Sequence, residues 1–516
     1  MRVLYVDIDS LRPDHIGCYG YDRPTSPTID ALAARGVRFE ECFASDTPCL
    51  PSRTAMLSGR HGTKSGVVTH FGAGQFYEEP GEGHMPDPAR PASFRYLSEA
   101  GVHTTTVTSF SKRHLADHFT ASFRESIQPT PQVGLEDAED VTGSATTWLD
   151  DHAAEDDWLL HVNYWDVHHP YENVAEAREQ VEGPVTAGPG AEQLAALSEM
   201  AGTRCATQWG NPREYDGEAF AHEAYEEWPI PERFTDRADV EHVLEGYDAA
   251  VRKVDGHVER LLAELERHGV REETAVVVTA DHGEAFGEHG LFAEHGFAHP
   301  ACQRVPMVVD WPGVTDDTDG PVTEKVYQFD LVATLADLFG ADQPAGWDAE
   351  PFTAALRGES FEGREALVCS QGIFTFGRAV YEGEWAFVRL LHPGVFSVPG
   401  LYNDPDLEDR GMELLYHRER DPYGLTDRAD EHPEVADRLR ARLDGFVSDA
   451  LGTVDAAGRD PLAEMAAESG PFLYVDPAEL ADLLERQGRP VPDAVRDARS
   501  WVPSKRRTGD GTAARS

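Results

Sequence analysis

Three short apolar segments, each followed by polar residues, constrain the fold of this chain most strongly. Residues 3–8, 158–163 and 274–280 have strand length and are rich in β-branched or aromatic residues. Helical patterns alternate with them, and the strongest, residues 240–265, repeats apolar side chains at three- and four-residue steps. This alternation predicts an α/β fold with an open sheet that helices cover on both faces.

Acidic residues and a histidine follow two of these strands. Asp9 comes directly after residues 3–8, and Asp281 and His282 follow residues 274–280. Asp7 and Asp9 alternate with apolar residues, so both carboxylates are expected on one side of the strand. Buried acids are costly unless a metal or hydrogen bonds satisfy them.

The side chains of Asp9, Asp281 and His282 make a ligand set for Ca²⁺. Mn²⁺ is an alternative if the imidazole is a ligand, and Mg²⁺ is a further one. The plainer interpretation is a group of hydrogen-bonded residues at strand ends, without a metal.

Cys49 stands at the start of a predicted helix. Pro51 can occupy the first helical position, and Gly59 stands where the helix would end. The positive end of a helix dipole favours a thiolate or a bound oxyanion beside Cys49. The alternative is a structural cysteine in an ordinary turn between a loop and a helix.

The charge balance excludes several classes of partner. The 516 residues include 45 basic and 93 acidic ones, a formal net charge of −48. Such a charge argues against nucleic acid and against an anionic membrane as partners. It resembles the composition of proteins from salt-accumulating, haloarchaeal-type organisms and predicts a loss of stability when salt is removed.

Targeting signals and cysteine spacing give no sign of a secreted or membrane-spanning protein. No window of about 18 apolar residues is present, and the first residues are too short an apolar run for a secretory signal. The six cysteines show no paired spacing. A cytoplasmic location is therefore expected.

Several motifs occur in the order found in one enzyme family. Cys49-x-Pro51-Ser52-Arg53 is followed by a lysine–histidine segment with Lys112 and His114, a loop with His168, and the block that begins at Asp281. Together they resemble the sulfatase family over most of residues 1–451. The resemblance implies an alkaline phosphatase-like fold, with a large mixed sheet flanked by helices and a smaller C-terminal α+β subdomain.

The same resemblance implies a mechanism. Cys49 would be oxidised to formylglycine by a maturation enzyme or activity, and its hydrated form would attack the sulfur of a sulfate ester. Arg53 and Lys112 would hold the nucleophile and the anionic ester, and His114 would act as the base. His168 would protonate or orient the leaving oxygen. The implied substrate is a small-molecule or saccharide sulfate ester.

Two positions depart from the family pattern. Ser10 stands where a second aspartate is usual, so either Ser10 or Asp7 is expected to compensate. No lysine follows the block at Asp281, and His295, or else His299, is expected to take the leaving-group role.

The predicted organisation has three parts. Residues 1–360 form the catalytic domain, in which residues 172–236 read as an insertion or lid. Residues 361–451 form the small-sheet subdomain, and residues 452–516 form a tail with one short helix at 476–487.

Two other functions remain open at this point. A phosphodiesterase or phosphonate monoester hydrolase of the same superfamily can use the same cysteine motif. A metal-binding scaffold without turnover is the other alternative, and Lys112, His114 and His168 argue against it because a scaffold does not need them.

Overall fold

The structure is a computed structural model of the whole chain. It describes residues 1–70, 72–77, 81–82, 85–86, 92–131, 136–200, 204–205, 227–231, 234–318, 320–373, 375–391, 412–452, 459–469, 485 and 491. The predicted tail helix at 476–487 and much of the 172–236 segment lie outside these residues.

A seven-stranded sheet forms the centre of the protein, and its strand order is β2-β14-β11-β1-β9-β7-β8. The strands are β1 (Arg2–Ile8), β2 (Val37–Arg38), β7 (His103–Val107), β8 (Glu125–Ile127), β9 (Trp158–Tyr164), β11 (Thr274–Thr279) and β14 (Met307–Asp310). The strands from β11 to β8 run parallel to one another, whereas β14 pairs antiparallel with β11, and β2 pairs antiparallel with β14. The mixed sheet and the three predicted strands are therefore confirmed.

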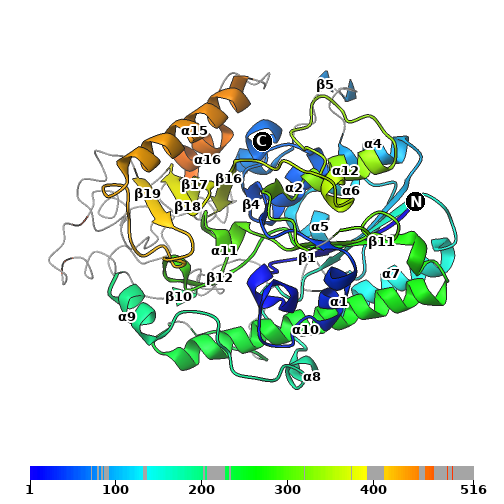
Figure 1. Cartoon of the computed structure of the whole chain (residues 1–516), viewed down its shortest axis with the longest axis horizontal. Helices are drawn as coiled ribbons and strands as arrows, with labels where there is room; N and C mark the ends of the chain where they lie inside the picture. The colour runs from blue at the N-terminus through cyan, green and yellow to red at the C-terminus, as the bar shows by residue number, and fades with distance from the viewer. Residues whose placement is uncertain are drawn as a thin grey trace, which may run out of the picture.

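Helices cover both faces of this sheet (Figure 1). On one face lie α1 (Pro27–Arg35), α7 (Ala138–His152) and the long α10 (Arg237–Arg267). On the other lie α2 (Cys49–Ser58), α4 (Ser93–Glu99) and α12 (Asp330–Leu338). All seven residues of β1 are buried between these layers, which explains why its sequence is an almost continuous apolar run.

A second sheet has the order β19-β18-β17-β16-β4. Four of its strands are C-terminal: β16 (Ala366–Ile373), β17 (Thr375–Glu382), β18 (Trp385–Leu390) and β19 (Met412–His417). The helix α15 (Pro433–Gly452) packs on it and buries Val380, Phe387 and Leu439 in a separate apolar cluster. The small α+β subdomain is thus present as predicted.

The fifth strand of this sheet comes from the N-terminal part of the chain. The two-residue strand β4 (Asp46–Thr47) pairs in parallel with β16, and Asp46 lies opposite Ser370. Because α2 begins at Cys49, the small sheet continues almost directly into the helix that carries this cysteine.

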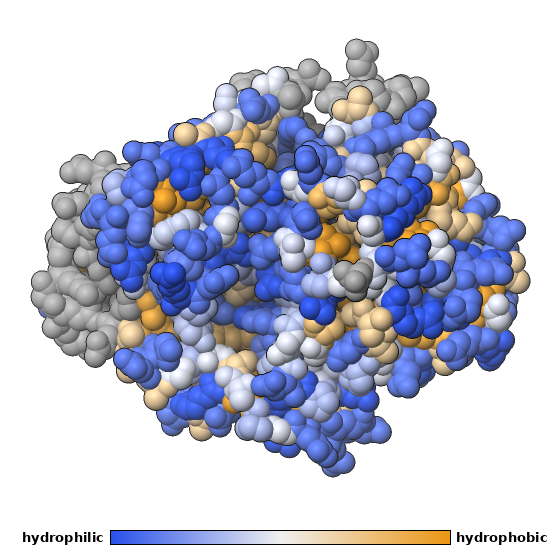
Figure 2. Space-filling model, in the orientation of Figure 1, coloured by the Kyte–Doolittle hydropathy of each residue, from blue (hydrophilic) through white to orange (hydrophobic). Residues whose placement is uncertain are grey.

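The surface agrees with the acidic composition. Hydrophilic residues dominate the face shown in Figure 2, with apolar residues scattered between them. Within the described residues, no helix combines the length and apolar character needed to cross a bilayer.

Candidate active site

The carboxyl ends of two adjacent parallel strands bring the predicted acids together. In the β1–β11 pair, Asp7 lies opposite Thr279. Asp9 and Asp281, each two residues further along, therefore leave the sheet at the same edge. Their side chains are fully buried.

Arg53 joins the acids. From the first turns of α2 its Nε donates to Asp7 Oδ2 at 2.8 Å, and its Nη1 donates to Asp9 at 2.9 Å and to Asp281 at 2.6 Å. Asp7 and Asp9 thus point to one side of β1, as their alternation predicted. Breaking such a buried network by removing one partner would leave an uncompensated charge.

Ser10 occupies the position of the expected second carboxylate. Its backbone has a positive φ of 61°, and its N–H donates to Asp281 Oδ1 at 3.2 Å. Its hydroxyl donates to Asp9 Oδ1 at 3.0 Å. Ser10 therefore orients both acids, while Asp7 contacts Arg53 and lies 3.4 Å from His161.

Cys49 lies against His282. The distance between Cys49 Sγ and His282 Nε2 is 3.1 Å, and His282 Nδ1 donates to the Gly283 carbonyl at 2.8 Å. Since the carbonyl holds the proton on Nδ1, Nε2 presents a lone pair. Ligand atoms of Asp9, Cys49, Asp281 and His282 all lie within 4.8 Å of one another.

The electrostatics of Cys49 differ from the sequence-based expectation. Burial raises the pKa of its thiol to about 12, and the Asp9 carboxylate adds to the rise. The thiolate predicted from the helix terminus is therefore wrong, because a dipole contribution of about 0.3–1 kcal/mol is smaller than the cost of desolvation. The helix also begins at Cys49 itself, so Pro51 is its third residue.

His295 lies beside this cluster. Its ring stacks on that of His282 with centroids 4.2 Å apart, and it groups with Cys49 and His282 at ligand distance. Its Nδ1 lies 3.3 Å from Glu284 Oε1. Burial lowers the pKa of His295, but Glu284 and other neighbours outweigh it and raise that pKa well above its usual value.

His168 and His114 line the same region. The His168 ring centroid is 5.3 Å from that of His295, and its Nδ1 donates to the His169 carbonyl. Burial lowers the pKa of His168 to about 3. The ring centroids of His114 and His70 lie 4.6 Å apart, and His70 Nε2 accepts a hydrogen bond from the Leu50 backbone N–H at 3.1 Å.

Lys112 and Arg113 differ in burial. Lys112 is exposed on the short helix α5 (Phe110–His114), whereas the next residue, Arg113, is partly buried. The Arg113 guanidinium carbon lies 4.6 Å from the centre of the Trp165 ring. Arg53 also contacts this ring, at 5.6 Å, so Arg113 is the basic residue that α5 directs toward the site.

A family model described as Sulfatase matches residues 2–341, well over half of the chain. The chain belongs to the sulfatase family.

Curated relatives of this sulfatase are distant. Mouse iduronate 2-sulfatase is 24% identical over 61% of this chain, and the match spans 60% of that enzyme's length. Human arylsulfatase A is 24% identical over 91% of this chain and 93% of its own.

Solved structures share the fold of this sulfatase. A sulfatase-like protein of Bacteroides thetaiotaomicron has a TM-score of 0.65 at 18% identity and covers 87% of this chain and 92% of its own. The phosphonate monoester hydrolase of Agrobacterium radiobacter has a TM-score of 0.62 at 18% identity, with coverages of 87% and 96%. A third, solved with its substrate D-glucosamine-2-N,6-O-disulfate, has a TM-score of 0.63 at 16% identity, with coverages of 88% and 98%. These likenesses confirm the alkaline phosphatase-like fold.

Sequence reasoning missed four residues of this candidate site: His70, Arg113, Trp165 and Glu284. Glu284 could have been found, since it follows Asp281 and His282 within one short block. Arg113 neighbours a predicted residue, but the orientation of a five-residue helix is not readable from its pattern.

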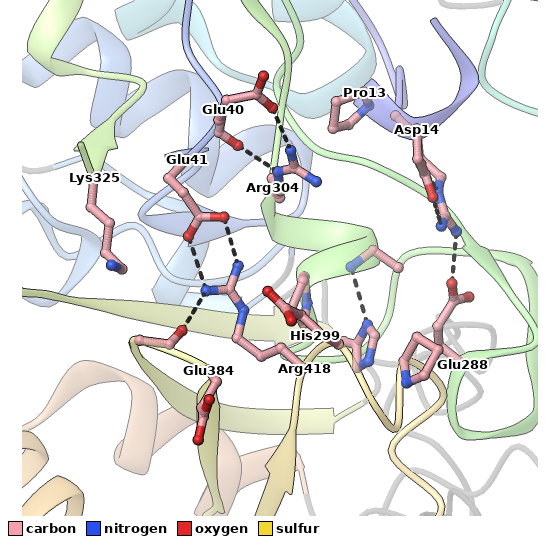
Figure 3. Close-up of a pocket in the computed structure, with 16 residues that line it drawn as sticks. Pro13, Asp14, Glu40, Glu41, Glu288, His299, Arg304, Lys325, Glu384 and Arg418 are labelled. Atoms are coloured by element: carbon pink, nitrogen blue, oxygen red, sulfur yellow. Dashed lines mark hydrogen bonds and ion pairs between the residues drawn. The ribbon is translucent and has the colours of Figure 1, made fainter. Parts of the chain in front are cut away.

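His299 lies away from the cysteine. Its ring stacks on Tyr416 of the small sheet, with ring centroids 5.5 Å apart, and it lines a cavity of about 490 Å³ together with Arg304 and Arg418 (Figure 3). Cys49, His282 and His295 do not line this cavity. Its arginines are paired with acids, as Arg418 is with Glu41. Of the two histidines expected to replace the lysine, only His295 lies at the site.

Proposed function

We propose that this sulfatase hydrolyses an organic sulfate ester to an alcohol and inorganic sulfate, with a formylglycine formed from Cys49 and a divalent metal. The observation that carries the proposal is the position of Cys49. It begins a buried helix, lies 3.1 Å from His282 Nε2 and shares a ligand-sized space with Asp9 and Asp281.

The residues present fit a divalent cation. Three buried carboxylates face the single guanidinium of Arg53, so two negative charges remain when all three acids are ionised. Asp7 Oδ1 has no hydrogen-bond partner among the described residues. Asp9, Asp281, His282 and residue 49 would hold Ca²⁺, or Mn²⁺ or Mg²⁺, with Asp7 supporting Arg53. The cation would supply positive charge to the ester, and formylglycine the oxygen nucleophile.

Two arginines stand where an anionic ester would need positive charge. Arg53 and Arg113 both contact the Trp165 ring, at 5.6 and 4.6 Å. Because Lys112 is exposed, we assign to Arg113 the sulfate-binding role expected of Lys112. His114, which stacks near the same indole at 6.2 Å, is the proposed base.

His295 is the proposed donor of a proton to the leaving oxygen. It lies at ligand distance from Cys49, and its Nδ1 lies 3.3 Å from Glu284 Oε1. His168, whose ring lies 5.3 Å from that of His295, would orient the leaving group because its Nδ1 proton is engaged by the His169 carbonyl.

A side-by-side assay tests the reaction type. An aryl sulfate, a phosphate diester and a phosphonate monoester are offered to the purified protein in high salt, with Ca²⁺ or Mn²⁺, and Cys49→Ala is the control. Preferential cleavage of the sulfate supports the proposal. A preference for the phosphorus esters would instead assign the activity of the phosphonate monoester hydrolase that shares this fold. No turnover of any ester would favour a metal-binding scaffold.

The substrate class and the maturation step belong to the same proposal. A neighbour of this fold binds a sulfated glucosamine, which favours a saccharide or small-molecule sulfate ester here. An enzyme or activity that oxidises Cys49 is required as a partner. Mass spectrometry of the peptide that spans residue 49 tests the modification directly.

A further inference from the structure

A cluster of two histidines and a glutamate lies at the amino ends of the parallel strands, opposite the strand ends that carry the candidate active site. His103 is the first residue of β7, and its Cα pairs with that of Trp158, the first residue of β9. His152 is the last residue of α7, and Glu155 follows it in the loop to β9. The Cys49 cluster lies instead at the carboxyl ends of the parallel strands, one strand length away.

The three side chains converge. Glu155 Oε1 lies 3.2 Å from His152 Nδ1, and Glu155 Oε2 lies 3.5 Å from His103 Nδ1. One ligand atom from each residue fits within a group no more than 4.8 Å across. A tetrahedral zinc ion with bonds of about 2.0–2.1 Å separates its ligands by about 3.3 Å. Each imidazole lies at nearly this distance from one oxygen of Glu155, His152 from Oε1 and His103 from Oε2.

A second layer of contacts fixes the two imidazoles. His103 Nε2 lies 3.4 Å from Glu125 Oε2, and the same oxygen accepts the Trp148 indole N–H at 2.9 Å. The Trp148 ring stacks on His152 at 4.8 Å and meets His103 edge-on at 5.6 Å. A carboxylate on the far nitrogen of a histidine is the usual support of a metal ligand.

No described lysine or arginine forms an ion pair with Glu125 or Glu155. A second surface group of similar composition, Asp150, Glu264 and His268, differs in this respect. There the Arg267 guanidinium already pairs with both carboxylates. The group at His103 is therefore the one whose negative charge a metal ion would balance.

We propose that His103, His152 and Glu155 bind a divalent transition metal of the zinc class, with Glu125 orienting His103. Two imidazoles and one carboxylate suit Zn²⁺, whereas Ca²⁺ requires six to eight oxygen ligands. The ion ties the end of α7 to the start of β7 and to the loop whose backbone carbonyls hold Arg2. Its role is structural, because an ion that binds the folded protein but not the unfolded chain stabilises the folded state.

Zinc binding to the full-length, chelator-treated protein tests this site. Wild type should bind one more equivalent of Zn²⁺ than His152→Ala. Zinc should also raise the melting temperature of wild type more than that of His152→Ala. Glu125→Gln keeps all three ligands and should weaken zinc binding about 10- to 100-fold. Cys49→Ala should keep the equivalent that His152→Ala loses, which separates the two clusters.

Any hydrolytic activity of wild type should persist unchanged in His152→Ala, because this residue lies outside the active site. Equal zinc stoichiometry and affinity in wild type, His152→Ala and Glu125→Gln would overturn the proposal. So would displacement of this zinc equivalent by stoichiometric Ca²⁺. These readouts measure metal binding and do not depend on whether a sulfate ester is the substrate.

Discussion

His282 Nε2 lies 3.1 Å from Cys49 Sγ, and the opposite nitrogen of the ring is committed to the Gly283 carbonyl. The backbone therefore holds the Nε2 edge of the imidazole toward residue 49. This arrangement places the lone pair of a neutral histidine beside Cys49 at the carboxyl ends of the strands.

Cys49→Ala should abolish turnover and leave the fold intact. The residue is 2% exposed and the change removes one sulfur atom, so the stability cost should be about 1 kcal/mol. Activity assays and thermal unfolding check both parts. Retained activity would reject Cys49 as the nucleophile precursor, and an unmodified thiol in active protein would reject the formylglycine.

Arg113→Ala should weaken the binding of the sulfate group, whereas Lys112→Ala should have less than about a twofold effect. A charge-assisted hydrogen bond contributes about 1.5–3 kcal/mol, so the inhibition constant of inorganic sulfate should rise about 10- to 100-fold in Arg113→Ala. Arg113→Lys should recover part of the loss. The reverse ranking of the two alanine variants would restore Lys112 to the anion site.

Glu284→Ala should impair esters with poor leaving groups most. Glu284 contacts His295 Nδ1 at 3.3 Å and holds the ring beside Cys49, so its loss misplaces the proton donor. We expect kcat to fall about 100-fold for an alkyl sulfate and only a few-fold for a nitrophenyl sulfate. Glu284→Gln, which retains an acceptor oxygen, should recover part of the difference. An equal loss for both esters would indicate a general structural role.

His61 should make stability depend on pH. Burial lowers the pKa of His61 from 6.5 to about 4, and its ring packs on Tyr327, Phe329 and Phe446. Between pH 4 and pH 6.5, His61 binds a proton more readily in the unfolded chain than in the folded one. The free energy of unfolding therefore rises with pH over this range, and the contribution of His61 to it is lost on acidification. A shift of this size corresponds to about 3 kcal/mol.

Denaturant unfolding at pH 7 and pH 4 measures this contribution. His61→Gln, which cannot titrate, should show a smaller loss on acidification than wild type. Phe446→Leu alters packing against the same ring without removing the titrating group, so its loss should match that of wild type. An unchanged pH dependence in His61→Gln would contradict the assignment.

The strands and the acids at their ends could be predicted because both depend on local pattern. A buried parallel strand has a continuous apolar run, and Asp9 and Asp281 follow two such runs directly. Parallel pairing then brings them to the same edge. Arg53 followed from its motif, but its contacts with three acids required the packing of α2 against the sheet.

The parts that could not be predicted depend on orientation or on very short elements. Which of Lys112 and Arg113 faces the site is decided by how a five-residue helix packs on Trp165. The pairing of β4 with β16 involves two residues and leaves no periodic signal. The raised pKa of Cys49 depends on burial among acids, which the helix-start pattern does not reveal.

The pairing of Asp46 with Ser370 has a practical meaning for anyone dividing this protein into parts. A fragment that ends near residue 360 would keep every side chain of the proposed active site yet lose the partner strand of the segment just before Cys49. Thr47 would also lose the contacts of its hydroxyl with Ser370 and Gln371. The two sheets are therefore joined directly before Cys49, and neither is a separable module.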